Sequence, residues 1–164
     1  MGETMSGNCR LDVKFYAPPA DLAPCFTTFY RLEVEPLGCD YVEDYLQPEW
    51  ANLRFFFGNP PYARVMDGPE VDGCRFQATG PSSRPAYFRL GQTRMWGVGL
   101  LPLGWARFVG VPAYEYANTV SDGECSEIFA PFAPLAEELF DHEPDDEREF
   151  RHLIEFFRGL PGPL

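Results

Sequence analysis

The residues that could perform metal or nucleophilic chemistry are few and poorly spaced for it. The two histidines, His142 and His152, lie ten positions apart in a region expected to be helical, so they do not form the ligand pair that a β-barrel metal site needs. Ser82 and Ser83 follow Gly80-Pro81 without the glycine pattern of a nucleophile elbow and without a nearby histidine base. The sequence therefore predicts no metal, no cofactor and no catalytic residue, and a protein that is not an enzyme.

Carboxylate and thiol chemistry are weaker alternatives. Glu43, Asp44 and Glu49 flank a predicted strand, but the chain has 25 acidic residues and chance proximity is expected. The five cysteines are spaced singly, which predicts reduced thiols, with a cationic neighbour only for Cys9 and Cys74. A small β-barrel enzyme without a metal remains an alternative to a binding module, and a pure dimerisation scaffold is another.

Aromatic residues are abundant, at 16% of the chain, and several alternate with polar residues. Because side chains on a strand alternate between its two faces, Asn52, Arg54 and Phe56 should share one face while Leu53, Phe55 and Phe57 share the other. A polar or cationic group among aromatic rings could orient a small ligand in a cavity. The predicted ligand-binding residues are Trp50, Asn52, Arg54, Phe56, Tyr87, Arg89, Trp96 and Trp105.

The segment Gly97-Val98-Gly99 resembles the start of a dinucleotide-binding fingerprint, but Pro102 occupies the place of its third glycine. No long strand–helix–strand unit surrounds it. The small residues are better explained by the close approach of another backbone or a bulky ring.

These residues are carried by a chain whose first two thirds have the pattern of short β-strands. Aromatic and β-branched runs separated by Gly, Pro and Asp clusters predict strands at residues 26–35, 52–57, 75–78, 86–90 and 95–101. The spacing favours a β-barrel or sandwich.

Helical periodicity replaces the strand pattern after Cys125. Apolar residues recur at helical spacing between 128 and 140 and again between 150 and 157, and Asp146 with Glu149 resembles a helix start signal. A short helix is also expected at 105–109, after Pro102. We therefore expect an α+β protein with a β-barrel region (1–124), an antiparallel helix hairpin (125–158) and a linker (159–164).

Composition restricts the partners. The 164 residues and 45% apolar content suit a single domain, and no apolar run is long enough to cross a bilayer. The N-terminus lacks the blocks of a signal peptide, which predicts a cytoplasmic protein. A net charge of −12 disfavours nucleic acid binding, because that binding depends on neutralising phosphates with Lys and Arg.

Three segments resemble the uncharacterised N-terminal domain of certain AraC-family transcription regulators. They are VEDYLQPEWANLRFFFG (42–58), TGPSSRPAYF (79–88) and TRMWGVGLLPLGWARFVGVPAYEYANTVSD (93–122). The third is the most specific, with a strand ending in a Gly-Val pattern, a short helix and a Gly-Val-Pro-Ala turn. The three segments make up 57 of the 164 residues, and the resemblance is taken to extend over nearly the whole chain.

The resemblance implies an effector-sensing, cupin-like barrel that dimerises and that is joined to helix-turn-helix units. It implies that DNA is bound only through that second domain, for which this sequence has no recognition helix after Arg158. No family residue with a known ligand role can be carried over to a position here, so the effector stays unidentified.

A homodimer is also expected, in which apolar residues of the C-terminal helices or a sheet edge are buried; the alternative is that the rings of the helical region all pack inward on their own barrel. Five large rings are more than two short helices need to cover one face of a barrel, and a surplus apolar surface commonly forms an interface. The rings are Phe129, Phe132, Phe140, Phe150 and Phe157.

Overall fold

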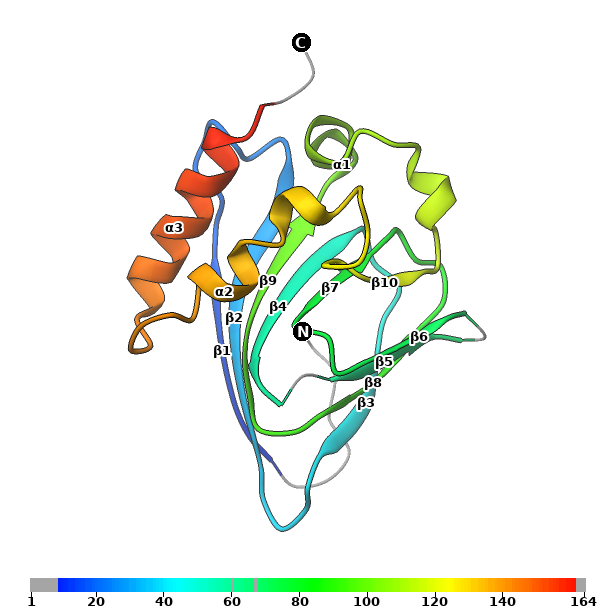
Figure 1. Cartoon of the computed structure of the whole chain (residues 1–164), viewed down its shortest axis with the longest axis vertical. Coiled ribbons are helices and arrows are strands. Elements are labelled where there is room, and N and C mark those ends of the chain that lie inside the picture. Colours follow the sequence, from blue (N-terminus) through cyan, green and yellow to red (C-terminus); the bar gives the residue numbers. More distant parts are fainter. Residues whose placement is uncertain (1–8, 60, 67, 162–164) are drawn as a thin grey trace.

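The computed structural model describes residues 9–59, 61–66 and 68–161, and this part of the chain is mainly β with a C-terminal helix (Figure 1). The larger of two antiparallel sheets has the order β1 (Cys9–Tyr16), β2 (Phe26–Pro36), β9 (Thr93–Leu100), β4 (Asn52–Gly58), β7 (Phe76–Thr79) and β10 (Val120–Asp122). The smaller has the order β3 (Val42–Leu46), β8 (Ala86–Leu90), β5 (Tyr62–Val65) and β6 (Glu70–Asp72).

The five predicted strands are confirmed within two residues at each end, as β2, β4, β7, β8 and β9. No residue ranges were predicted for five further strands, which are β1, β3, β5, β6 and β10. β1 has five exposed and three partly exposed residues, so it lacks the buried apolar run by which a strand is recognised.

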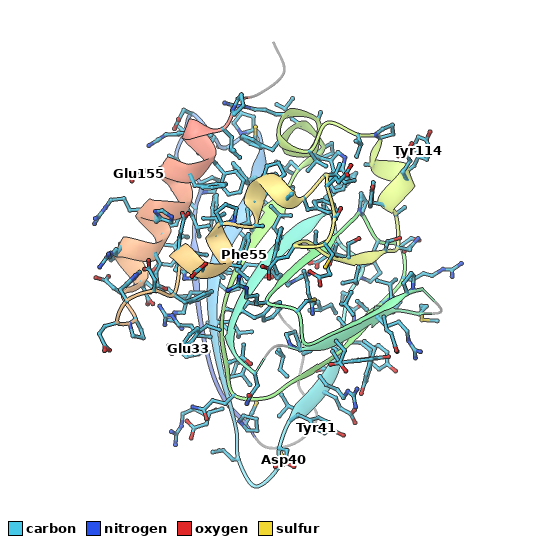
Figure 2. All side chains as sticks on the ribbon, in the orientation of Figure 1. Glu33, Asp40, Tyr41, Phe55, Tyr114 and Glu155 are labelled. Atoms are coloured by element: carbon cyan, nitrogen blue, oxygen red, sulfur yellow. The ribbon has the colours of Figure 1, made fainter. Side chains whose placement is uncertain are left out.

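The large sheet separates two apolar cores. Leu53 and Phe55 of β4 face the helices, and Figure 2 shows Phe55 between the strand and the helical segment in front of it. Phe56 faces the small sheet, where it packs with residues such as Phe88 and Met95. The predicted alternation along β4 is therefore confirmed, and the molecule has three layers: small sheet, large sheet and helices.

The helical elements after the strands differ in length from the prediction. Helix α1 (Pro102–Phe108) confirms the short helix, with proline at its first turn, where no backbone donor is needed. The expected helix at 128–140 is reduced to the 3-10 turn η2 (Ala130–Phe132) and α2 (Leu135–Glu138). Pro131 and Pro134 explain this, because proline removes a helix hydrogen bond and clashes with the preceding turn.

Helix α3 (Asp146–Gly159) confirms the second predicted helix, shifted by one residue at its start. Asp145, rather than Asp146, is the N-cap, and its carboxylate accepts a hydrogen bond from the backbone of Arg148 at 3.2 Å. Glu149 accepts from the Asp145 backbone N–H at 2.8 Å, which satisfies a second free donor. The sequence correctly predicted a capping pair of an Asp and Glu149 at the start of this helix. The N-cap is Asp145 and not Asp146.

A buried ionic network fixes α3 on the large sheet. Glu149, only 1% exposed, accepts hydrogen bonds at 2.7 Å from both Arg94 and the Trp96 indole. Asp146 accepts from Arg94 at 2.7 Å and from Arg31 at 3.0 Å. These partners lie on β2 and β9, so the network sets the position of the helix over those two strands (Figure 1).

The five phenylalanines expected to mark an interface are turned towards the protein's own core. Phe129, Phe132 and Phe157 are fully buried, Phe140 stacks on Phe57, and Phe150 stacks on Tyr16. Phe140 and Phe150 are partly buried against the same core, so none of the five rings is fully exposed, and a homodimer stays a prediction.

The expected linker begins later than residue 159. Gly159 is the last residue of α3, and Leu160 still packs against the helix-side core, while residues 162–164 lie outside the described residues. In the part of the chain that the structure describes, no helix is both long enough and apolar enough to span a membrane.

Candidate ligand-binding site

A small cavity of about 40 Å³ lies between the two sheets; we refer to it as the inter-sheet cavity. Its volume suits one or a few small groups rather than a drug-sized molecule. Most of its wall is apolar and includes Leu32, Phe56, Ala63, Phe88, Leu90 and Met95. Its polar wall consists of Gln47, Glu49, Arg54, Gln77, Thr79 and Ser82.

Arg54 is the charged centre of the polar wall. Its side chain is 7% exposed and forms an ion pair with Glu49, which is 34% exposed at the solvent-facing end of the cavity. Arg54 Nε donates to the Tyr30 hydroxyl at 3.0 Å, and Nη1 donates to Thr79 Oγ1 at 3.4 Å. A guanidinium has five N–H donors, and partners among the described residues use three of them.

Gly97 makes the contact between Tyr30 and Arg54 possible. Tyr30 on β2 and Arg54 on β4 are both paired in register with Gly97 on the intervening strand β9. A Cβ atom at Gly97 would overlap the Tyr30 ring, so the tyrosine can lie across β9 only because that position has no side chain. The predicted close approach of a bulky ring to this glycine segment is confirmed.

The partners of Arg54 keep it charged despite its burial. Burial alone lowers the pKa of Arg54, but interactions with Tyr30 and Glu49 outweigh it and hold this pKa above its ordinary value. The inter-sheet cavity therefore contains a fixed guanidinium, paired with Glu49, in the same lining as a mostly apolar wall. Such an arrangement suits an anionic group attached to an apolar body.

The backbone around Glu49 is anchored independently of its side chain. The Glu49 backbone N–H donates to Ser82 Oγ at 3.1 Å, and the Ser82 backbone N–H donates to the Glu49 carbonyl at 2.8 Å. The Glu49 side chain can therefore change rotamer without loss of these two hydrogen bonds. The inter-sheet cavity keeps its polar wall when that happens.

Asn52 adds a second polar group on the same face of β4, two residues from Arg54. It is 5% exposed, and its Nδ2 donates to the Trp50 carbonyl at 3.4 Å. Its Oδ1 is buried without a hydrogen-bond partner among the described residues. Asn52 lines a groove beside the inter-sheet cavity together with Tyr30, Gln47 and Glu49.

Three of the predicted ligand-binding residues are brought together at this site. Arg54 and Phe56 line the inter-sheet cavity, and Asn52 lies beside it. Trp50 precedes them in the chain, but its side chain is mostly exposed and lines neither wall.

The other four predicted residues lie elsewhere. Tyr87 and Arg89 are on the outer face of the small sheet, where a hydrogen bond from Tyr87 to Glu43 raises the pKa of Tyr87 to about 12. Trp96 and Trp105 are buried on the helix side of the large sheet, where their indole groups donate to Glu149 and to the Val111 carbonyl. These two tryptophans are core residues with satisfied polar atoms.

The residues considered for acid–base or metal chemistry are dispersed. Glu43 faces outwards from the small sheet, whereas Glu49 pairs with Arg54. His142 lies beside Asp141 before α3, and His152 contacts Glu138. Among the described residues, no group of three or more His, Cys, Asp or Glu side chains is arranged to hold a metal ion.

Tyr30, Gln77 and Thr79 were missed by sequence reasoning. Gln77 lies opposite Arg54 on β7, and Thr79 lies opposite Asn52. Alternation along predicted strands indicates which residues share a face of one strand, but it does not indicate which strands are neighbours. Only Gly97 carried a local signal, because a glycine within a strand suggests a close approach.

Searches against protein-family models and curated proteins found no match to this chain. No family is assigned from them. The resemblance to AraC-type regulators is an expectation from the three quoted segments alone.

Proposed function

We propose that this chain is a ligand-binding regulatory domain that takes a small molecule into the inter-sheet cavity. The observation that carries the proposal is Arg54, a buried cation beside a cavity whose wall is mostly apolar, with three of its five N–H donors used by partners among the described residues. A structural arginine in a core is normally enclosed by its partners. Here the one carboxylate partner, Glu49, faces solvent and can be exchanged.

The two alternatives have less support. Among the described residues that line the inter-sheet cavity, none is a histidine, cysteine or lysine, and its two ionised groups neutralise each other. That arrangement offers no obvious general base or nucleophile. A pure scaffold would be expected to fill the space between its sheets, as close packing is the rule in protein interiors.

We propose further that the domain senses an effector in an AraC-type cytoplasmic regulator. The support is the resemblance of residues 42–58, 79–88 and 93–122, together with an architecture of β-sheets followed by a C-terminal helix. DNA would be contacted through a helix-turn-helix domain outside this sequence. With its charge of −12, the chain alone is expected to show no sub-micromolar binding to duplex DNA in fluorescence anisotropy at low salt.

A homodimer also fits this role, and the outer face of the small sheet is the surface that favours it. Tyr45 is half exposed on that face and packs against Tyr87, and the Arg89 guanidinium lies 4.4 Å from the centre of the Tyr62 ring. Tyrosine and arginine are enriched at interfaces. Because Arg89 shares this face with Glu43, a second copy related by a two-fold axis would meet complementary charges.

Light scattering after size exclusion, across a hundredfold dilution, tests the dimer. The wild-type protein and Tyr114→Arg should show the same dimeric mass, because Tyr114 is exposed on the far 3-10 turn η1 (Ala113–Tyr116) (Figure 2). Tyr45→Arg should shift the mass towards the monomer. A monomeric wild-type protein at the highest concentration would refute the dimer and leave ligand binding unaffected.

Ligand binding is tested by melting the protein against a panel of small acids, amines, alcohols and sugars. A ligand that binds only the folded state raises Tm with its concentration, and calorimetry should then give one site per chain. Ala63→Leu fills the inter-sheet cavity and should abolish binding. Arg64→Leu places the same side chain on the opposite face of β5 and should not.

Two results would contradict the proposal. One is the lack of saturable binding across the whole panel. The other is a ligand whose affinity is the same in wild-type protein and in folded Ala63→Leu.

A further inference from the structure

We infer that the ligand is a short-chain monocarboxylate and that Glu49 is a built-in occupant of its carboxylate site. This inference rests on the proposed function, since it names the ligand class for the same cavity. The Glu49 carboxylate already occupies the position on Arg54 that a ligand carboxylate would take. The fold thus contains an internal competitor for its own ligand.

The chemistry of Arg54 favours a carboxylate as the ligand group. A guanidinium binds carboxylates through paired N–H donors, and Arg54 is oriented for this by Tyr30 and Thr79. Gly97 and the paired strands fix Tyr30, so the direction of the guanidinium is set before a ligand arrives. A neutral alcohol or an amine would leave the positive charge of Arg54 unmatched once Glu49 had moved.

Glu49 is placed so that its side chain can leave Arg54. Its side chain is five times more exposed than that of Arg54, at 34% against 7%, so the freed carboxylate would move directly into water. The pair of backbone hydrogen bonds to Ser82 does not involve that side chain. Exchange therefore requires a rotamer change and no movement of the strands.

The apolar wall of the inter-sheet cavity limits the rest of the ligand. Leu32, Phe56, Ala63 and Met95 form an apolar wall next to the guanidinium, which fits an alkyl or small ring tail. The volume of about 40 Å³ restricts that tail to a few carbon atoms. A molecule with several carboxylates would meet the net charge of −12 without further cations in the cavity, so a single carboxylate is preferred.

The test measures the affinity of matched acids and neutral analogues by calorimetry on the whole chain. Acetate, butyrate, hexanoate and benzoate are compared with butyramide, butanol and butylamine at constant ionic strength. Wild-type protein should bind butyrate at least tenfold more tightly than butyramide. Glu49→Gln removes the internal competitor and should raise the affinity for the acid by at least about tenfold while leaving that for butanol unchanged.

Matched variants separate this effect from a general change of charge. Glu43 lies on the outer face of the small sheet, where its carboxylate accepts a hydrogen bond from Tyr87. Glu43→Gln removes the same charge as Glu49→Gln and should leave the affinity for the acid unchanged. Arg54→Leu should abolish acid binding and retain butanol binding. If Arg54→Leu does not fold, Arg54→Lys replaces it in the test. Arg54→Lys keeps the positive charge but loses the paired N–H donors, and it should weaken acid binding at least tenfold.

The outcomes distinguish the inference from the proposed function. Equal affinity for butyrate and butyramide, or an unchanged acid affinity in Glu49→Gln, overturns the inference but leaves a ligand-binding cavity. Binding of neither class to any folded variant overturns both.

Discussion

Tyr30 and Arg54 lie on strands that are not neighbours, yet the Tyr30 hydroxyl accepts a hydrogen bond from Arg54 Nε at 3.0 Å across Gly97. The contact depends on the missing side chain at Gly97, which leaves room for the tyrosine ring over β9. It couples the packing of the large sheet to the orientation of the charged group at the candidate site.

Gly97→Ala should damage both stability and binding. The added Cβ would overlap the Tyr30 ring, and overpacking of this kind typically lowers the free energy of unfolding by roughly 1–3 kcal/mol. Displacement of Tyr30 should also weaken ligand binding through Arg54. Urea denaturation and calorimetry measure the two effects. Gly159→Ala is the control, because a Cβ at Gly159 meets no atom within 4 Å. It should lower neither the free energy of unfolding in urea denaturation nor the ligand affinity in calorimetry.

Glu149→Ala should be among the most destabilising single substitutions on α3. It would remove one of the carboxylates of Arg94, which keeps Asp146, and would leave the buried Trp96 indole without an acceptor, and an unsatisfied buried group of this kind costs about 1–3 kcal/mol. Glu155→Ala changes the same residue type on the exposed side of this helix and should stay within about 0.5 kcal/mol of wild type (Figure 2). Equal effects of the two substitutions in urea denaturation would contradict the role given to Glu149.

The same network predicts how stability depends on acid pH. Burial alone raises the pKa of Asp146, but hydrogen bonds from Arg31 and Arg94 outweigh it and hold this pKa below the ordinary value of 3.8. A lowered pKa in the folded state means that the contribution is complete above pH 3.8 and is lost as the pH falls through the folded-state pKa. Asp146→Asn should therefore lower Tm at pH 6 and flatten the fall in Tm below pH 3.8. A parallel fall in both proteins would argue against this assignment.

Cys74 is expected to be an unreactive thiol, in contrast to the hint from its neighbour Arg75. Burial, with a further contribution from Asp122, raises the pKa of Cys74 to about 11, while Arg75 pairs with Glu124 instead. The thiolate is the reactive form, so alkylation of Cys74 should be slow at pH 8 and accelerate towards pH 11. Mass spectrometry of iodoacetamide-treated protein can follow this site by peptide. Rapid labelling of Cys74 at pH 7 in the folded protein would refute the expectation.

The sequence by itself determined the parts of this protein that depend on short-range pattern. Alternation along β4 placed Asn52, Arg54 and Phe56 on one face, because successive side chains of a strand point to opposite sides whatever the strand pairs with. The period of apolar residues in α3 likewise identified its buried stripe. Pro131 and Pro134 also indicate locally that the helix expected at 128–140 is shortened to α2. The helical spacing of the apolar residues in that segment outweighed this signal in the prediction.

Tertiary structure alone decided which face of each strand meets which neighbour. Trp96 and Arg54 are both large side chains that carry N–H donors. Trp96 on β9 nevertheless faces the helices, whereas Arg54 on β4 faces the small sheet. Tyr30, 24 residues from Arg54 in the sequence, reaches it because of the order of the strands. Glu49, 5 residues from Arg54, is held near it by the hydrogen bond between its backbone and Ser82. Such contacts follow from the pairing of distant strands, which leaves no periodic trace in the segments that it brings together.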